Sequence, residues 1–323
     1  MIAAASGTAR SRVTTEARME LRLAWRTWLL PAVLVLCALL AIANVANAAG
    51  AVRADYAQLE HTRAEYAANH MNFLADLHKP ENVSSKGDNE SIGNLARFDY
   101  DTLATAIVAL SPGSSITESL KYLGFLIYPA LFFLIGLWMS TGQRRYRFEK
   151  VALVRAGTAR TVAARQVALL GIAAVVIAST LLVDVVSRAI TQSILFQQLP
   201  LDIFRPLSAA PAQNPLLQWV VILLLTVFFG AGGIAVGSVF GVFALPAIVF
   251  VIGNYVIPIL GVHDPRNWFE VLGHSVFNYS ASFELALPIP LAESTAFTAA
   301  GVSAAILVGV GYLGMRLRNP RAT

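Results

Sequence analysis

Three of the five histidines, His61, His70 and His78, lie near one another in the sequence, and histidine is a side chain that can bind a transition metal. Their spacings of nine and eight residues place them on no common face of a helix. No H-E-x-x-H, G-x-S-x-G or paired-cysteine motif accompanies them, and the chain has no G-x-x-x-x-G-K-[ST] phosphate loop. The sequence therefore predicts no metal site, no catalytic residue and no ATP hydrolysis by the chain itself, so we expect it not to be an enzyme.

An isolated carboxylate, Glu284, lies between Phe283 and the apolar residues 285–287, in a segment broken by Pro288 and Pro290. Apolar pieces this short can lie at membrane depth only where protein or a water-filled cavity covers them. Because an acid in such a position often belongs to a substrate or ion path, Glu284 and Phe283 are candidate path residues. The alternative is a carboxylate at the outer headgroup level that faces water.

The segment from Gln143 to Gln166 carries seven of the chain's cations and a single acid. Apolar residues interrupt the charges at near-helical spacing, and a Gly-Thr pair follows them. We predict a short amphipathic cytoplasmic helix that ends in a turn and can dock onto a partner protein. The alternative is a basic loop that only enforces topology. The candidate docking residues are Arg147, Phe148, Glu149, Val151, Val154, Arg155, Gly157, Thr158 and Arg160.

The layout of this segment resembles the coupling-helix region of type-2 ATP-binding-cassette (ABC) exporter permeases. The shared order is an acidic residue, a short apolar helix, a small-residue turn, basic residues and the next span. Residues 147–150 occupy the first place, 151–154 the second and 156–160 the third. The Gly-Thr that usually follows the acidic residue is absent here, and so is the proline of the turn.

The resemblance covers nearly the whole chain and implies a fold and a set of partners. It implies an interfacial N-terminal helix, six spans, a coupling helix after span two and an outer re-entrant element before span six. It also implies export by a permease dimer, formed with a second copy or a homologue. ATP and Mg²⁺ would bind to a separate cytoplasmic ABC ATPase subunit, and this chain would hold no cofactor. Similar permeases export lipid-linked glycans, peptide antibiotics, drugs or sodium, and the sequence favours none of these substrates.

Long apolar runs are the elements that must position these residues. Each is about as long as the ~20 residues that a helix needs to cross a bilayer. Because hydrocarbon cannot hydrogen-bond the backbone, such runs are expected to be helices. The predicted fold is an all-α polytopic membrane protein with six transmembrane helices: 29–49, 122–140, 167–186, 216–240, 242–260 and 296–313. The other predicted segments are a cytoplasmic tail with an interfacial helix (1–28), an extracytoplasmic insertion (50–121), the coupling loop (141–166), outer loops (187–215, and 261–295 with the re-entrant segment) and a cytoplasmic tail (314–323).

Charge is distributed unevenly between the two sides of these spans. Charged residues make up only 13% of the 323 residues, against about a quarter in soluble domains. The side with both termini carries fifteen of the twenty-four cations and three of the nineteen acids. Because cations near short loops stay cytoplasmic, we predict cytoplasmic termini and a cell (plasma) membrane location. The cations do not form a nucleic-acid surface, so the lipid bilayer and other proteins are the expected partners. Alanine and arginine usage indicates a bacterial source.

The segment before the first span has the pattern of a basic amphipathic helix. Val13, Ala17, Leu21, Ala24 and Trp28 recur at spacings of three and four, and arginines line a neighbouring face. We predict that this helix lies in the cytoplasmic interface. The alternative is a positive flank that anchors the first span by snorkelling.

Gly233, Gly237 and Gly241 recur every four residues in the fourth predicted span. Small residues at this spacing let two helices approach closely, so we predict that the stripe packs against another span or a second copy. The alternative is a set of membrane glycines with no common contact.

The outer insertion differs from the spans in its composition. Apolar residues at helical intervals predict that the first span continues as a helix beyond the membrane. Residues 79–94 read as a loop, and residues 95–110 are apolar enough to pack back on that helix, which gives a small helical cap.

The function predicted first is that of an ABC exporter permease. The alternative is a membrane sensor or scaffold, whose outer cap binds a ligand and whose basic loop recruits a cytoplasmic partner.

Overall fold

The structure, a computed structural model, describes residues 3–79, 83–86, 89–145, 153–154, 156–205, 214–279 and 285–318. This part of the chain is nearly all helical. The strands β1 (Val83–Lys86) and β2 (Asn89–Ile92) pair as an antiparallel hairpin. The sequence predicted a loop there, so this detail was wrong.

Eleven α-helices and two short 3₁₀ turns make up the rest of the described chain. The helices are α1 (Ala3–Arg26), α2 (Leu29–Ala68), α3 (Phe73–Leu77), α4 (Leu95–Leu110), α5 (Ser115–Leu126), α6 (Tyr128–Arg145), α8 (Thr158–Gln198), α9 (Pro215–Phe240), α10 (Ala244–Tyr255), α11 (Pro265–Val276) and α12 (Glu293–Arg318), with η1 at Pro112–Ser114 and η2 at Leu201–Ile203.

Four of the described helices, α2, α8, α9 and α12, are long and apolar enough to cross a membrane. A fifth candidate is the pair formed by η1–α5 and α6, bent by 58°. The break follows from Pro129, which lies in the first turn of α6 and has no N–H to continue α5. The chain is therefore a helical protein with four to five candidate membrane spans.

The fifth predicted span, 242–260, differs most from the structure. Its helix, α10, has only 12 residues. At 1.5 Å per residue it is about 18 Å long, short of the ~30 Å of a hydrocarbon core.

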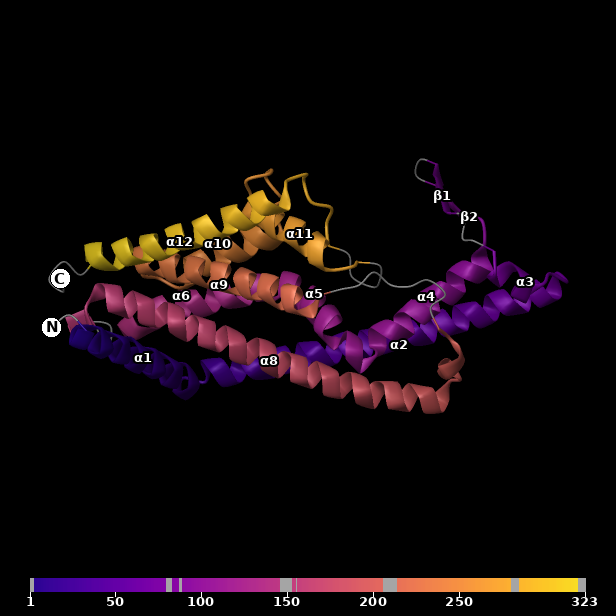
Figure 1. The fold of residues 1–323 in the computed structure, drawn as a ribbon, viewed down its shortest axis with the longest axis horizontal. Helices are drawn as coiled ribbons and strands as arrows, with labels where there is room; N and C mark the ends of the chain where they lie inside the picture. The colour runs from indigo at the N-terminus through magenta and orange to yellow at the C-terminus, as the bar shows by residue number, and fades with distance from the viewer. Residues whose placement is uncertain are drawn as a thin grey trace.

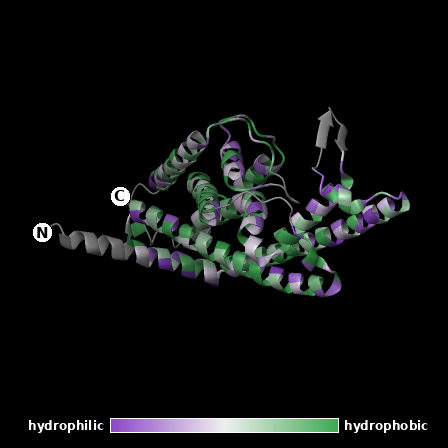
Figure 2. Ribbon diagram, turned by 45° about the vertical axis from the view of Figure 1, so that its right-hand side comes forward, coloured by the Kyte–Doolittle hydropathy of each residue, from purple (hydrophilic) through white to green (hydrophobic). Residues whose placement is uncertain are grey.

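The helices lie along one long axis, with distinct groups at the two ends (Figure 1). Both termini, α1, the end of α6 and the beginning of α8 lie at one end, and α3 with the β-hairpin lies at the other. Hydrophobic residues dominate the helices of the bundle, and hydrophilic residues become frequent along the far part of α2 and α3 (Figure 2).

The far end is built from the continuation of α2 and from α4, which packs back along it. Val52, Leu59 and Leu103 are fully buried between these helices. Thr62 donates a 2.5 Å hydrogen bond to Asp99 in the same interior. The helical continuation of the first span beyond residue 49, expected from the sequence, is therefore present, and α4 covers it.

The bundle centres on the contact between α6 and α9, whose backbones approach each other at glycines. A Cβ on Gly233 would overlap the Phe133 carbonyl oxygen and lie 2.7 Å from the Leu137 nitrogen. A Cβ on Gly237 would overlap the Ser140 hydroxyl. Gly241 has another role, because it ends α9 with φ 70°.

The helix α1 packs along α8 through a small buried face that includes Ala17 and Ala24. Glu20 of α1 pairs with Arg165 of α8 at 3.5 Å, and both side chains are buried. Trp28 has φ 63°, so the chain turns between α1 and α2 at this exposed residue. An amphipathic N-terminal helix thus precedes α2, with Trp25 exposed on it, whereas Trp28 lies outside the helix and not on its apolar face as predicted.

Candidate functional site

The connection between α6 and α8 is the first candidate site. Most of the docking residues predicted there, namely Arg147, Phe148, Glu149, Val151 and Arg155, lie outside the described residues. The described part, around Leu153 and Val154, is helical and ends at Gly157. The Gly157 nitrogen donates to the Leu153 carbonyl oxygen at 2.8 Å. Gly157 has φ 78° and ψ 162°, a conformation that favours glycine, and α8 begins at Thr158.

This short segment is anchored to two membrane helices. Leu153 is 1% exposed and packs in a cluster with Val162 of α8 and Met315 of α12. The next residue, Val154, is 82% exposed. Arg160, one turn into α8, is half-buried. A protein that covered Val154 would therefore press on an element fixed to both α8 and α12.

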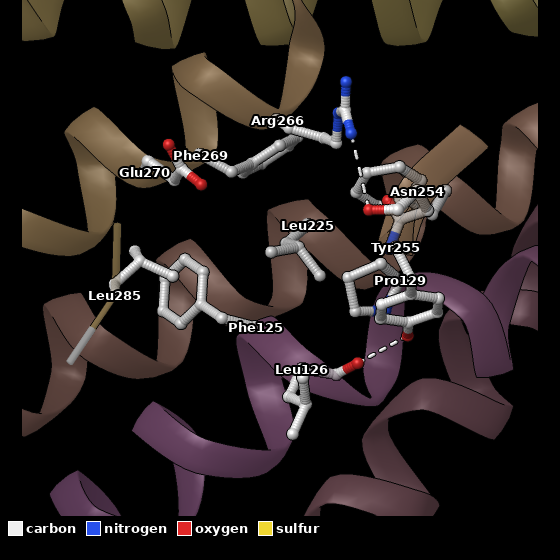
Figure 3. A pocket seen from close by; sticks show the side chains of 11 residues that line it. Phe125, Leu126, Pro129, Leu225, Asn254, Tyr255, Arg266, Phe269, Glu270 and Leu285 are labelled. Carbon is white, nitrogen blue, oxygen red and sulfur yellow. Dashed lines mark hydrogen bonds between the residues drawn. The ribbon is translucent and has the colours of Figure 1, made fainter. Parts of the chain in front are cut away.

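The second candidate site is a half-open pocket of about 180 Å³ between α5, α6, α9, α10 and α11. Figure 3 shows Arg266, Phe269 and Glu270 of α11 on one side, with Phe125 and Leu126 of α5 facing them. The break after α5 leaves the Leu126 carbonyl free of the helix, and it accepts a 2.5 Å hydrogen bond from the Tyr255 hydroxyl.

A partly buried hydrogen-bond network fixes α11 to the end of α10. Asp264 caps α11 by accepting from the Arg266 nitrogen at 2.9 Å, and it accepts from the Leu260 nitrogen at 3.1 Å. The Arg266 guanidinium donates to Asp264 at 2.6 Å and to the carbonyl oxygens of Gly253 and Pro258, both at 2.9 Å. Burial alone would raise the pKa of Asp264, but these hydrogen bonds hold it below its ordinary value.

Replacing Arg266 should destabilise the outer side of the bundle. Arg266→Gln removes the charged donor that satisfies the last carbonyls of α10 and leaves Asp264 without its partner. We expect a loss of about 2–3 kcal/mol in the free energy of unfolding, measured by denaturant titration in mild detergent. Arg53→Gln is the matched control, because Arg53 is exposed and reaches only Gln198, at 3.3 Å. Equal losses in the two variants would contradict this role of Arg266.

Glu270 differs from the other charged groups around the pocket. Its Oε2 atom is buried and has no hydrogen-bond partner in the described part of the chain. Arg266, the cation on the same helix, makes its ion pair with Asp264. Burial raises the pKa of Glu270 to about 7, although the positive charge of Arg266 opposes the rise. Glu270 is thus a carboxylate without a dedicated counter-ion, beside the apolar wall of a pocket.

The non-helical segment from 285 to 290 closes one side of the pocket. Asn267 of α11 is buried and binds this segment through two hydrogen bonds. Its side chain accepts from the Ile289 nitrogen at 2.7 Å and donates to the Ile289 carbonyl oxygen at 3.1 Å. Leu285 lines the pocket. The predicted path residues Phe283 and Glu284 lie directly before it, outside the described residues.

The re-entrant element was predicted at 270–294, with apolar pieces over 275–287. The helix α11 begins earlier, at Pro265, and overlaps only the first part of that range. Asp264 followed by Pro265 was the available signal, because an aspartate N-cap and a proline at the first helical position mark a helix start. That signal would have placed Glu270 in the second turn of a helix, on the face that lines the pocket.

No protein family, curated protein or solved structure matches the chain.

Proposed function

We propose that this chain is the membrane-spanning permease subunit of a type-2 ABC exporter. It would work as a dimer with a second copy or a homologous permease, and substrate would leave outward between the two. A separate cytoplasmic ATPase would bind ATP and Mg²⁺. The protein would lie in the bacterial cell membrane with both termini in the cytoplasm.

The observation that carries this proposal is the placement of Val154. An ATPase can drive a permease only through a cytoplasmic element that moves with the membrane helices. The segment at 153–157 has the required features, because Leu153 is buried against α8 and α12 while Val154 is exposed. The predicted docking residues surround it in the sequence, and their cations suit an acidic groove on a partner.

The arrangement of the helices is consistent with six crossings. The four long helices and the bent pair would cross five times, which is an odd number. Both termini lie at the same end of the bundle (Figure 1), so an even number is needed. The short helix α10, lengthened by the apolar residues 256–260, would supply the remaining outward crossing.

The test is co-purification with a candidate soluble ABC ATPase from the same organism. We expect Val154→Glu to lower the amount of bound ATPase at least about tenfold, because it places a charge at the centre of the contact. The stimulated ATP hydrolysis should fall with it. Leu74→Glu is the matched control, since Leu74 is 64% exposed but lies on α3, at the opposite end of the molecule.

The outcomes separate the two functions that the sequence left open. Binding that is lost in Val154→Glu and kept in Leu74→Glu supports the permease. If the wild-type chain binds no ATPase under gentle conditions, the permease proposal fails. The outer unit of α2 and α4 would then be tested as a ligand sensor.

A further inference from the structure

The pocket beside Glu270 is small and lined mainly by apolar and aromatic side chains. Its volume is about 180 Å³. An engineered cavity of about 150 Å³ in another protein binds benzene, so this one has room for a single ring with a small head group. Phe125, Phe229 and Phe269 contribute aromatic side chains to the lining, and Figure 3 shows Phe125, Phe269 and Leu225 around the pocket.

The electrostatics of the pocket favour a cation. Asp264 and Arg266 form an ion pair, and the remaining donors of Arg266 are taken by backbone carbonyls. Arg266 is therefore a poor partner for an incoming anion. When it is ionised, Glu270 carries a negative charge that no described side chain neutralises at contact distance. One carboxylate without further ligands does not make a metal site, and no group of three ligands is found in the described residues.

We propose that this pocket binds an organic ammonium group attached to a small apolar body, with Glu270 as the counter-charge and phenylalanine rings as the wall. Aromatic faces attract an ammonium ion, and the attraction grows when the site excludes water. A carboxylate and several rings around one cavity together select a cation over a neutral molecule of the same shape. The inference concerns ligand binding alone and does not depend on coupling to an ATPase.

The probe is radiolabelled benzyltrimethylammonium, bound to the purified full chain in a non-ionic detergent. Neopentylbenzene is its neutral isostere, because carbon replaces the charged nitrogen. We expect saturable binding of the cation and weak competition by the isostere. Equal competition by the neutral compound at the same free concentration would overturn the proposal.

Two variants locate the site. Glu270→Gln keeps the shape of the side chain and removes its charge, so binding should weaken about tenfold or more. Glu293→Gln is the matched control, because Glu293 is exposed at the beginning of α12 and does not line the pocket. Leu285→Trp, in the non-helical segment, should fill the pocket and abolish binding. Unchanged affinity in Glu270→Gln, with thermal stability preserved, would exclude this site.

The same probe gives a pH test, because its charge does not titrate. Burial raises the pKa of Glu270 to about 7, so its carboxylate is mostly ionised at pH 8 and mostly protonated at pH 6. The cation binds the ionised form, and affinity should fall about tenfold from pH 8 to pH 6. A pH-independent affinity would contradict the role of Glu270.

The pH dependence caused by Glu270 must be distinguished from any caused by other titratable groups nearby. On α11 these are Asp264, Arg266 and His274; α10 contributes Tyr255, and Tyr279 follows α11. The pocket residues of α5, α6 and α9 are all apolar. Glu270→Gln should therefore abolish the pH dependence. A pH dependence that persists in this variant would contradict the proposal.

The ammonium group could come from a free amine or from a lipid headgroup. Nanodiscs of phosphatidylglycerol with either phosphatidylethanolamine or the same fraction of an uncharged glycolipid distinguish these sources at equal anionic lipid content. Weaker probe binding in the discs with phosphatidylethanolamine would identify the lipid headgroup as a competitor for the same site. Equal binding in both would identify a free amine. Either result keeps the ammonium site, provided that Glu270→Gln removes probe binding.

Discussion

Replacing Gly233 with alanine should separate α6 from α9 and destabilise the protein by about 3 kcal/mol or more. The added Cβ would overlap the carbonyl oxygen of Phe133 and lie 2.7 Å from the Leu137 nitrogen. Both are backbone atoms of a helix, so no change of rotamer can relieve the overlap. The helices must move apart, and the packing of the bundle core is lost along their contact. The measurement is the free energy of unfolding in mild detergent.

Gly301→Ala is the matched control for this prediction. Gly301 lies inside α12, and a Cβ there would meet no atom within 4 Å. The substitution should stabilise the helix by roughly 0.5–1 kcal/mol, because alanine loses less backbone entropy than glycine. The two glycine-to-alanine changes should therefore have opposite signs. A Gly233→Ala variant as stable as Gly301→Ala would contradict the close approach of α6 and α9.

A second pair of variants separates backbone overlap from side-chain overlap. Gly237→Ala would meet the hydroxyl of Ser140, which is a side-chain atom. Ser140→Gly should therefore restore part of the stability that Gly237→Ala loses. It should not rescue Gly233→Ala, because the obstacle there is the Phe133 carbonyl. Rescue of both would indicate a general loosening of the helices instead of a specific contact.

The glycine repeat shows which helix contacts could be predicted from the sequence and which could not. Gly233 and Gly237 were recognised as residues that permit close packing, because a four-residue repeat places them on one helix face. Their partners could not be found, since Phe133, Leu137 and Ser140 of α6 lie about one hundred residues earlier and form no glycine repeat. Gly241 continued the repeat but has φ 70° at the helix end, and spacing alone cannot separate these roles.

The lengths of the spans were less predictable than their presence. Hydropathy finds apolar residues but does not show where a helix ends inside an apolar run. Pro129 breaks the second run into α5 and α6, and the Arg266 guanidinium terminates α10 by binding its carbonyls. The first of these signals is local and could have been used. The second comes from a residue beyond the run, so the sequence of the run alone could not reveal it.

The candidate ligand pocket was missed for a related reason. Glu284 was singled out because apolar residues flank it in the sequence, whereas Glu270 gains its apolar surroundings from Phe125 and Leu225 of other helices. Tertiary contacts of this kind leave no local pattern. The i, i+4 pair of Asp184 and Arg188 was visible in the sequence, but its burial and its contact with α4 were not.

Removing Arg188 should be the most damaging single change at the joint between the bundle and its outer unit. Its Nε donates to Asp184 at 2.7 Å, and its Nη1 donates to the Ala109 carbonyl oxygen near the end of α4. The Arg188 and Asp184 side chains are 1% and 0% exposed. Arg188→Met would leave the Asp184 carboxylate buried without its counter-ion, which typically costs about 3–5 kcal/mol.

A double variant tests whether the uncompensated charge is the cause. Asp184→Leu combined with Arg188→Met removes both charges, so much of the lost stability should return even though the Ala109 carbonyl still lacks its donor. Arg63→Met is the surface control: Arg63 is 59% exposed and lies 3.3 Å from Glu60, and its loss should cost about 0–1 kcal/mol. The readout is again the free energy of unfolding in detergent. A double variant no more stable than Arg188→Met would show that the uncompensated charge is not the cause, and would assign the loss to the missing hydrogen bond to α4.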